Sequence, residues 1–170
     1  MTLRIRAARS DEASTLRAIE DEAGARYAEA GLPPDLDGLT PPELAEGIEA
    51  GTAWVLADEE DHPVAFALCW RRGDALHLRE LDVLPARMGQ GLGSRLIEHV
   101  VAQAQALGCS QVTLTTFRDV AWNAPYYARR AFRVLEPSEQ PAFLRAIRED
   151  EDRGVLATWP RVAMARPLGA

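Results

Sequence analysis

A glycine-rich turn, Met88-Gly89-Gln90-Gly91-Leu92-Gly93, constrains the fold of this chain more than any other feature. It separates an apolar, β-rich run over 75–84 from a helical stripe that begins at Leu92. Glycines at alternate positions let the backbone adopt conformations that other residues avoid, and they let a bound group approach closely. A helix N-terminus adds unpaired N–H groups and a partial positive charge. The turn therefore predicts a strand–loop–helix unit whose loop suits a diphosphate.

The same turn is also compatible with a simple strand-to-helix connector, so its context has to decide. A dinucleotide site would need a third glycine at position 94 and an acidic residue at the end of the next strand, but Ser94 and Phe117 occupy these places. No Gly-Lys-Ser/Thr follows the glycines, as a nucleoside-triphosphate loop would require. The sequence therefore disfavours an NAD-dependent oxidoreductase and a kinase.

Hydrophobic periodicity predicts a mixed α/β fold for the rest of the chain. Ser10 is expected to cap a first helix that ends near Gly31, and the capping-box sequence Thr40-Pro41-Pro42-Glu43 begins a second. Further helices are expected over 92–107, 122–130 and the centre of 137–153, and strands over 3–7, 53–58, 64–70, 75–84, 111–117, 132–135 and 155–165. We expect one domain, residues 1–170, with a mostly antiparallel central sheet, one parallel βαβ unit and helices on both faces.

Composition narrows the choice of partners. The formal net charge is -7, from 19 Lys+Arg against 26 Asp+Glu, and no basic cluster suggests nucleic acid. No apolar run is long enough for a membrane span or a signal peptide, so a cytoplasmic protein is expected. Cys69 and Cys109 are expected to be buried free thiols, and three scattered histidines predict no metal site.

Two motifs resemble the GNAT (Gcn5-related) N-acetyltransferase family. The first is Leu81-Asp82-Val83-Leu84-Pro85, leading into Met88-Gly89-Gln90-Gly91-Leu92-Gly93-Ser94-Arg95-Leu96, which is similar to that family's pyrophosphate-binding strand, loop and helix. The second is the segment from Asn123 to Phe132, similar to its Asn...Tyr-x-x-x-Gly-Phe pattern. Two positions depart from the pattern: Met88 stands where Gln or Arg is usual, and Ala131 stands where Gly is usual. Ala131 argues against a turn that requires positive φ, unless the turn accepts strain.

The resemblance implies an enzyme that transfers acetyl from acetyl-CoA directly to a primary amine of a small-molecule or peptide acceptor. It implies that the backbone of Leu81, Asp82 and Val83 lies beside the pantetheine arm. It implies that the pyrophosphate lies on the loop residues Met88, Gly89, Gln90, Gly91, Leu92, Gly93 and Ser94, with Met88 offering its backbone N–H and Arg87 able to compensate for the missing polar side chain. It also implies that Asn123 hydrogen-bonds near the cofactor arm and that Tyr127 protonates the departing thiolate. We assign Tyr127 as the acid and Tyr126 as a packing or acceptor contact, and the sequence leaves open which of the two faces the thiolate.

The attacking amine must lose a proton, and Glu80 and Asp82 are candidate bases because they alternate onto one face of their strand. We assign Glu80 as the base, with a salt bridge to Arg79 or Arg118 as the alternative role of this carboxylate. Tyr127 has a similar alternative as a packing residue beside Phe132. The acidic run Glu20-Asp21-Glu22 is interpreted as the solvated face of the first helix and is left out of the site.

A non-catalytic acyl-CoA-binding regulatory domain is the competing hypothesis, because it would keep the glycine loop and need neither acid nor base. The sequence identifies no particular amine and leaves the oligomeric state, a homodimer included, undecided.

Overall fold

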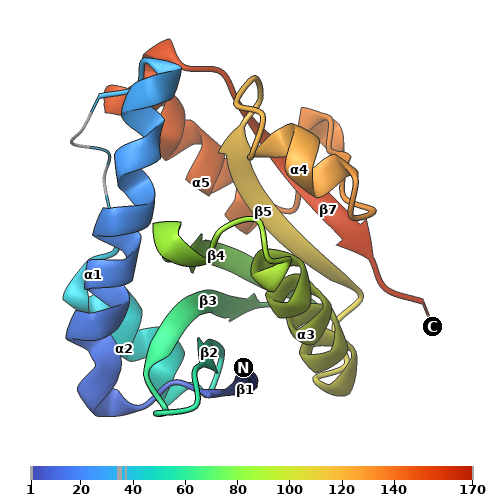
Figure 1. Cartoon of the computed structure of the whole chain (residues 1–170). Helices are drawn as coiled ribbons and strands as arrows, with labels where there is room; N and C mark the ends of the chain where they lie inside the picture. Colours follow the sequence, from blue (N-terminus) through green and yellow to red (C-terminus); the bar gives the residue numbers. More distant parts are fainter. Residues whose placement is uncertain (1, 34–35, 37, 170) are drawn as a thin grey trace. The chain divides into compact units, whose positions relative to one another are not determined.

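The computed structural model describes residues 2–33, 36 and 38–169 (Figure 1). Its strands form one sheet in the order β1-β2-β3-β4-β5-β7-β6. The strands are β1 (Arg4–Ala7), β2 (Ala53–Ala57), β3 (Pro63–Arg72), β4 (Ala75–Val83), β5 (Gln111–Phe117), β6 (Arg133–Val134) and β7 (Arg161–Pro167). The α-helices are α1 (Ala13–Gly24), α2 (Pro41–Glu49), α3 (Leu92–Ala106), α4 (Ala124–Ala128) and α5 (Ala142–Arg153).

The sheet has the predicted mixed character. β4 and β5 are parallel, with Ala75 opposite Gln111 and His77 opposite Thr113. The pairs β1–β2, β2–β3, β5–β7 and β6–β7 are antiparallel. Because α3 connects β4 to β5, these three elements form the expected βαβ unit. The predicted fold class is therefore confirmed.

The chain divides into two compact units. Unit 1 comprises Met1–Arg71 with Leu78–Gln103, and unit 2 comprises Arg72–His77 with Ala104–Ala170. The expected single domain over 1–170 stays a prediction. Among the described residues, no helix combines the length and the apolar character that crossing a membrane requires.

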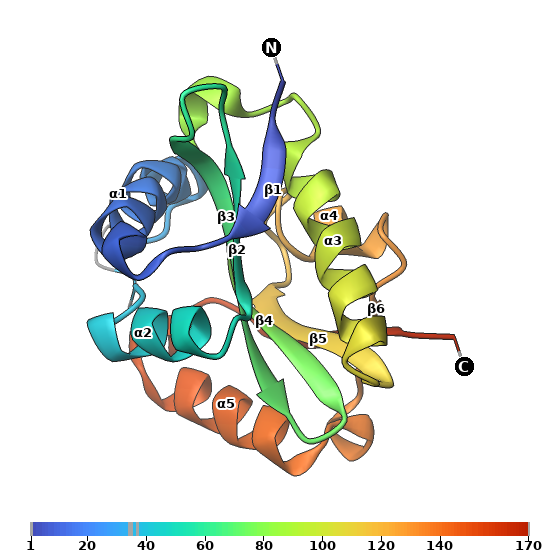
Figure 2. The same cartoon turned by 90° about the horizontal axis from the view of Figure 1, so that it is seen from below.

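In unit 1, helices cover both faces of the strands β1–β3 (Figure 2). Leu16 and Ile19 of α1 and Leu44 of α2 pack in one cluster with the inward residues of β2 and β3, which are Ala53, Val55, Ala57, Phe66 and Leu68. Trp54, next to Val55, contacts His99 of α3 with 5.3 Å between ring centroids. Neighbouring residues of a strand point to opposite faces, so α3 covers the face away from α1 and α2.

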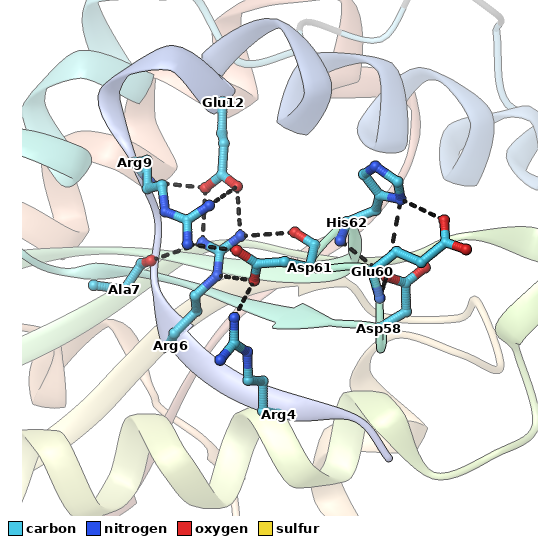
Figure 3. A network of polar contacts seen from close by, with 9 residues as sticks. All are labelled: Arg4, Arg6, Ala7, Arg9, Glu12, Asp58, Glu60, Asp61 and His62. Atoms are coloured by element: carbon cyan, nitrogen blue, oxygen red, sulfur yellow. Dashed lines mark hydrogen bonds and ion pairs between the residues drawn. The ribbon is translucent and has the colours of Figure 1, made fainter. Parts of the chain in front are cut away.

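A polar network ties β1 and the start of α1 to the β2–β3 turn (Figure 3). Asp61 accepts hydrogen bonds from Arg4 (2.7 Å) and Arg6 (2.8 Å), and it also accepts one from Arg9. Arg6 forms two further bonds with the Glu12 carboxylate, at 2.6 and 2.9 Å. We call Arg4, Arg6, Arg9, Glu12 and Asp61 the arginine network. In it three guanidinium groups neutralise two carboxylates.

In unit 2, α5 packs on the strand pair β5–β7. The fully buried Leu144 of α5 forms a cluster with Leu135, Ala163 and Ala165, the last two from β7. Phe143 lies beside the buried His77 ring, with 5.8 Å between centroids, and His77 Nδ1 is 3.0 Å from the Thr113 hydroxyl. The apolar face of α5 thus explains why this charge-rich segment folds as a helix.

Two local predictions are wrong and two are confirmed. Ser10 does not cap α1, because Ser10–Glu12 already form a 3-10 turn, which Arg9 precedes, and α1 begins only at Ala13. The last strand begins after Pro160 and not at Val155, since proline lacks the N–H that a ladder needs and residues 155–158 form a 3-10 turn. The Thr40–Glu43 capping box is present, and both cysteines are buried free thiols.

Candidate functional site

The glycine loop of unit 1 has the backbone geometry that the sequence predicted. Gly89 and Gly91 adopt φ of 75° and 76°, in the left-handed region that side chains disfavour. A Cβ atom added at either position would meet no atom within 4 Å, so conformation and not crowding requires glycine there. The loop opens α3, whose buried Leu92 anchors the first turn. The loop residues Gly89, Gln90 and Gly91 are therefore exposed just before the N-terminus of α3.

Met88 has a hydrogen-bond partner within the protein. Its N–H donates to the Pro85 carbonyl at 3.2 Å, at the end of the turn Pro85–Arg87. The phosphate contact predicted for Met88 stays a prediction. The Met88 sulfur lies 3.5 Å from Nη1 of Arg26, a residue that the sequence did not single out. Position 88 lacks a polar side chain, but the guanidinium of Arg26, from the segment after α1, lies beside Met88. Only proximity in the fold reveals Arg26, because it lies 62 positions away in the chain.

An acidic cluster in unit 1 surrounds Arg79 of β4. Arg79 Nε is 3.1 Å from Glu43 of α2, and its Nη1 is 3.3 Å from Glu80. The guanidinium also lies over the Trp70 ring, 5.7 Å from its centroid. The salt bridge weighed as the alternative role of Glu80 is therefore present, with Arg79 as the partner. One guanidinium is shared between two carboxylates.

Glu20 corrects the interpretation of the first helix. Its two carboxylate oxygens accept from the Leu39 N–H at 2.8 and 3.1 Å, and the side chain is only 12% exposed. Burial, followed by the charge of Glu80, raises the pKa of Glu20 to about 7. Asp21 and Glu22 are exposed, as expected for a solvated face. Glu20 therefore belongs to the acidic cluster, which we define as Glu20, Glu43, Glu80 and Asp82.

Asp82 is the member of the cluster with the poorest local compensation. Its Oδ2 atom is buried and has no hydrogen-bond partner among residues 2–33, 36 and 38–169. Burial, and then the charges of Glu80 and Glu20, raise the pKa of Asp82 well above its ordinary value. The predicted alternation of Glu80 and Asp82 onto one face of β4 agrees with this mutual repulsion. Glu20, Glu80 and Asp82 are thus close enough to disfavour one another's charge.

The second sequence motif lies in unit 2, where Asn123 joins β5 to α4. Its side-chain oxygen accepts from the Thr116 hydroxyl (2.7 Å) and from the Phe117 N–H (3.4 Å). Asn123 is 5% exposed, and its backbone carbonyl accepts from the Tyr127 N–H at 3.0 Å. The amide oxygen thus fixes the start of α4 against the end of β5. The cofactor contact predicted for Asn123 stays a prediction.

Tyr126 and Tyr127 have different surroundings. The Arg130 guanidinium stacks on the Tyr126 ring, 3.5 Å from its centroid, and donates to the Tyr126 carbonyl. Tyr127 packs edge-on against Phe132, with 5.6 Å between ring centroids. Tyr126 is thus engaged by a cation, and its assigned role as a packing or acceptor contact stays a prediction. The acid role of Tyr127 stays a prediction.

Ala131 adopts φ of 64°, so the turn before Phe132 uses the left-handed region. This is the position where the Asn...Tyr-x-x-x-Gly-Phe pattern has glycine. Of the two expectations for Ala131, the strained turn with positive φ is therefore the one observed. Phe132 is 3% exposed, and its N–H donates to the Tyr127 carbonyl at 3.3 Å. Burial of Phe132 holds the turn closed and offsets the strain at Ala131.

The comparisons with known proteins agree with this geometry. The model of the Acetyltransferase (GNAT) family matches residues 16–132, more than half of the chain. N-acetylglutamate synthase from Neisseria gonorrhoeae, complexed with coenzyme A and N-acetyl-glutamate, superposes with a TM-score of 0.77 at 19% identity, covering 100% of this chain and 36% of that one. The chain thus spans about a third of that synthase.

Two further structures match over nearly their whole length. A GNAT-family acetyltransferase from Staphylococcus aureus Mu50 has a TM-score of 0.72 at 15% identity, with 99% of this chain and 100% of that chain covered. The ribosomal-protein-S18-alanine N-acetyltransferase from Escherichia coli has a TM-score of 0.66 at 17% identity, with 99% and 96% covered. These likenesses show the acetyltransferase fold. With the family match over 16–132, they lead to one conclusion: the chain belongs to the GNAT acetyltransferase family.

Proposed function

We propose that this chain is an N-acetyltransferase that moves the acetyl group of acetyl-CoA to a primary amine by direct attack. Residues 1–170 would act as one acetyltransferase domain. The observation that carries the proposal is the loop at the start of α3, where Gly89 and Gly91 hold left-handed conformations with open space outside them. Membership of the GNAT family and the neighbours solved with coenzyme A support the choice of donor.

The donor site follows from the loop and the strand before it. The backbone N–H groups of Gly89, Gly91 and the first turn of α3 suit the pyrophosphate, and the side chains of Gln90 and Ser94 lie in the same segment. Leu81, Asp82 and Val83 would flank the pantetheine arm through their backbone. Met88 would contribute through its contact with Arg26, since its N–H is already bonded to Pro85.

The chemistry needs one proton removed and one supplied. The amine nitrogen bonds to the thioester carbonyl carbon as Glu80 accepts a proton from the amine, and the carbon–sulfur bond then breaks. Tyr127 gives its phenolic proton to the departing thiolate, a step that a neutral phenol can perform near pH 7. Asn123 would keep α4, and therefore Tyr127, in place at the end of β5.

Binding of CoA tests the loop assignment. Gly91→Ala should weaken CoA binding about tenfold or more, because the displaced backbone loses charge-assisted hydrogen bonds. Gly108→Ala is the matched control: Gly108, just beyond the C-terminal end of the same helix, also has positive φ and no atom near its added Cβ. Equal CoA dissociation constants for the two variants, measured by calorimetry, would remove the loop from the donor site.

Turnover tests the acid and separates the enzyme from a regulatory domain. Tyr127→Phe should lower amine-dependent CoA release by about 10²–10⁴-fold, whereas Tyr126→Phe should change it little. A full rate in Tyr127→Phe would contradict the assigned acid. Tight CoA binding by the unmodified protein, with no release of CoA for any amine in a broad panel, would favour the non-catalytic acyl-CoA-binding domain instead.

A further inference from the structure

The acidic cluster holds more negative charge than its own cations neutralise. Glu20, Glu43, Glu80 and Asp82 face two arginines, Arg17 and Arg79. Arg17 also pairs with Asp21, at 2.9 Å, so its charge is divided. Arg79 is likewise divided between Glu43 and Glu80. Ionisation of all four carboxyl groups would therefore leave a net negative charge around β4, α1 and α2, and mutual repulsion is one reason that the pKa values of Glu20 and Asp82 are raised.

The buried Oδ2 atom of Asp82 is a second observation, independent of the count of charges, that points to a missing donor at this place. A buried carboxylate oxygen without a hydrogen-bond donor is costly, and folded proteins seldom tolerate one unless a ligand or ion satisfies it. Its neighbours Glu80 and Glu20 are acceptors when ionised and repel its charge. A cationic donor from outside the chain would supply what the described residues do not.

Glu20 cannot relieve the charge by turning to solvent. The Leu39 N–H holds both of its oxygens, and Arg17 Nη1 donates to Glu20 at 3.2 Å and to the Leu39 carbonyl at 2.7 Å. Arg79 is similarly held between Glu43 and the Trp70 ring. The side chains of Glu20 and Arg79 are therefore held in place before a positive group binds, so binding does not have to order them.

We propose that the acceptor is a dicationic amine, in which Glu20 and Asp82 bind a second ammonium group a few carbons from the amine that reacts. The inference rests on the proposed function, since it names the acceptor class of the same site. During transfer the second ammonium keeps its protons and its bonds. Glu20 and Asp82 are thus specificity-determining residues, whereas Glu80 takes the proton of the reacting amine.

Proton release makes the site measurable without turnover. A cation beside Glu20 favours its charged form and lowers its pKa from about 7. The charged groups around this carboxylate are Arg17 and Asp21 on α1, Arg79, Glu80 and Asp82 on β4, and Glu43 on α2. Binding of a dication at pH 7 should therefore release more protons than binding of a monoamine, by about half a proton from Glu20 alone.

Calorimetry in two buffers of different ionisation enthalpy tests this release. The CoA-loaded protein is titrated with putrescine and, separately, with butylamine; both carry a reacting amine, so the difference isolates the second ammonium. We expect tighter binding and extra proton release for putrescine, with the extra release lost in Glu20→Gln. Equal proton release for the two amines, or a difference that survives Glu20→Gln, would overturn the inference even if CoA release confirms the acetyltransferase.

Kinetics with matched variants separate recognition from folding. Glu20→Gln should lower kcat/KM for putrescine about tenfold or more and change that for butylamine less than about twofold. Asp82→Asn should lower the ratio of kcat/KM for putrescine to kcat/KM for butylamine about tenfold or more. Glu22→Gln, the same change at an exposed position on α1, should alter neither. Equal losses for both amines would show a structural role for these carboxylates and contradict the inference. Absence of CoA release with every amine would contradict the proposed function alone, and the calorimetric result would still decide the cation site.

Discussion

The arginine network and the acidic cluster are built from the same kinds of side chain, and both lie in unit 1. In the arginine network three guanidinium groups surround Asp61, and the pKa of this carboxyl is held well below its usual range (Figure 3). In the acidic cluster one guanidinium serves two carboxylates, and the pKa of Glu20 and that of Asp82 are raised. Guanidinium groups outnumber carboxyl groups in the first, and carboxyl groups outnumber guanidinium groups in the second.

The difference separates a structural use of charge from a binding use. The arginine network satisfies its carboxylates with hydrogen bonds from within the chain, so it joins β1, α1 and the β2–β3 turn. The acidic cluster keeps like charges together at a cost in stability, and protein groups do not remove that cost. Unfavourable charge that is retained in a fold is a sign of a functional site.

Removal of Arg6 should give the largest change in stability. Arg6→Met leaves Glu12 largely buried, at 8% exposure, without its bidentate partner, and should lower the free energy of unfolding by about 2–3 kcal/mol. Arg4→Met, at a side chain 60% exposed, should cost less than about 1 kcal/mol. Urea denaturation measures both. Equal losses of unfolding free energy in the two variants would mean that burial does not distinguish the two arginines. A changed preference between amines in Arg6→Met would contradict the purely structural role of the arginine network.

Replacement of Glu20 should have an intermediate effect whose sign depends on pH. The pKa of Glu20 is about 7 in the folded chain, above its ordinary value, so the folded state keeps a proton that the unfolded state has lost. The wild type therefore loses stability as pH rises from about 4.5 through 7, and Glu20→Gln does not, giving the variant a relative gain of about 1–3 kcal/mol across this window. Unfolding free energies at pH 5 and pH 8 measure the gain. A difference in unfolding free energy that is the same at both pH values, or that grows in favour of the wild type at pH 8, would contradict the raised pKa of Glu20.

Neutralisation of Asp61 should have the smallest effect. Asp61 adopts φ of 68°, and asparagine tolerates this conformation, so Asp61→Asn removes charge without adding backbone strain. We expect a lower Tm at low ionic strength and a smaller deficit at high salt, because salt screens exposed ion pairs. A fall in Tm that is the same at low and high salt would mean that Asp61 stabilises the fold through the geometry of its hydrogen bonds and not through its charge.

Local signals made part of the site predictable from sequence. The alternating glycines indicated left-handed turns before a helix, and Gly89 and Gly91 adopt them. Thr40 and Glu43 form the expected capping box because both partners lie within one turn. The alternation of Glu80 and Asp82 followed from the geometry of a strand.

Glu20 and Arg26 were not predictable, because their environments come from distant segments. On α1 alone Glu20 lies in an acidic run typical of a solvated face, whereas in the fold its carboxylate accepts from the Leu39 N–H, 19 positions away. Ala131 shows a second limit: the sequence leaves two conformations open for this alanine, and packing of the buried Phe132 decides between them. Tertiary packing overrode the local preference at both places.

The pH dependence of the preference for a dication over a monoamine tests the central claim most directly. The ratio of kcat/KM for putrescine to kcat/KM for butylamine is measured by CoA release from pH 6 to pH 8.5, and deprotonation of the reacting amine largely cancels in this ratio. Ionisation of Glu20 should raise the ratio as pH passes about 7 in the wild type and should leave it flat in Glu20→Gln. A flat ratio near one in the wild type would contradict a cation-binding acceptor site.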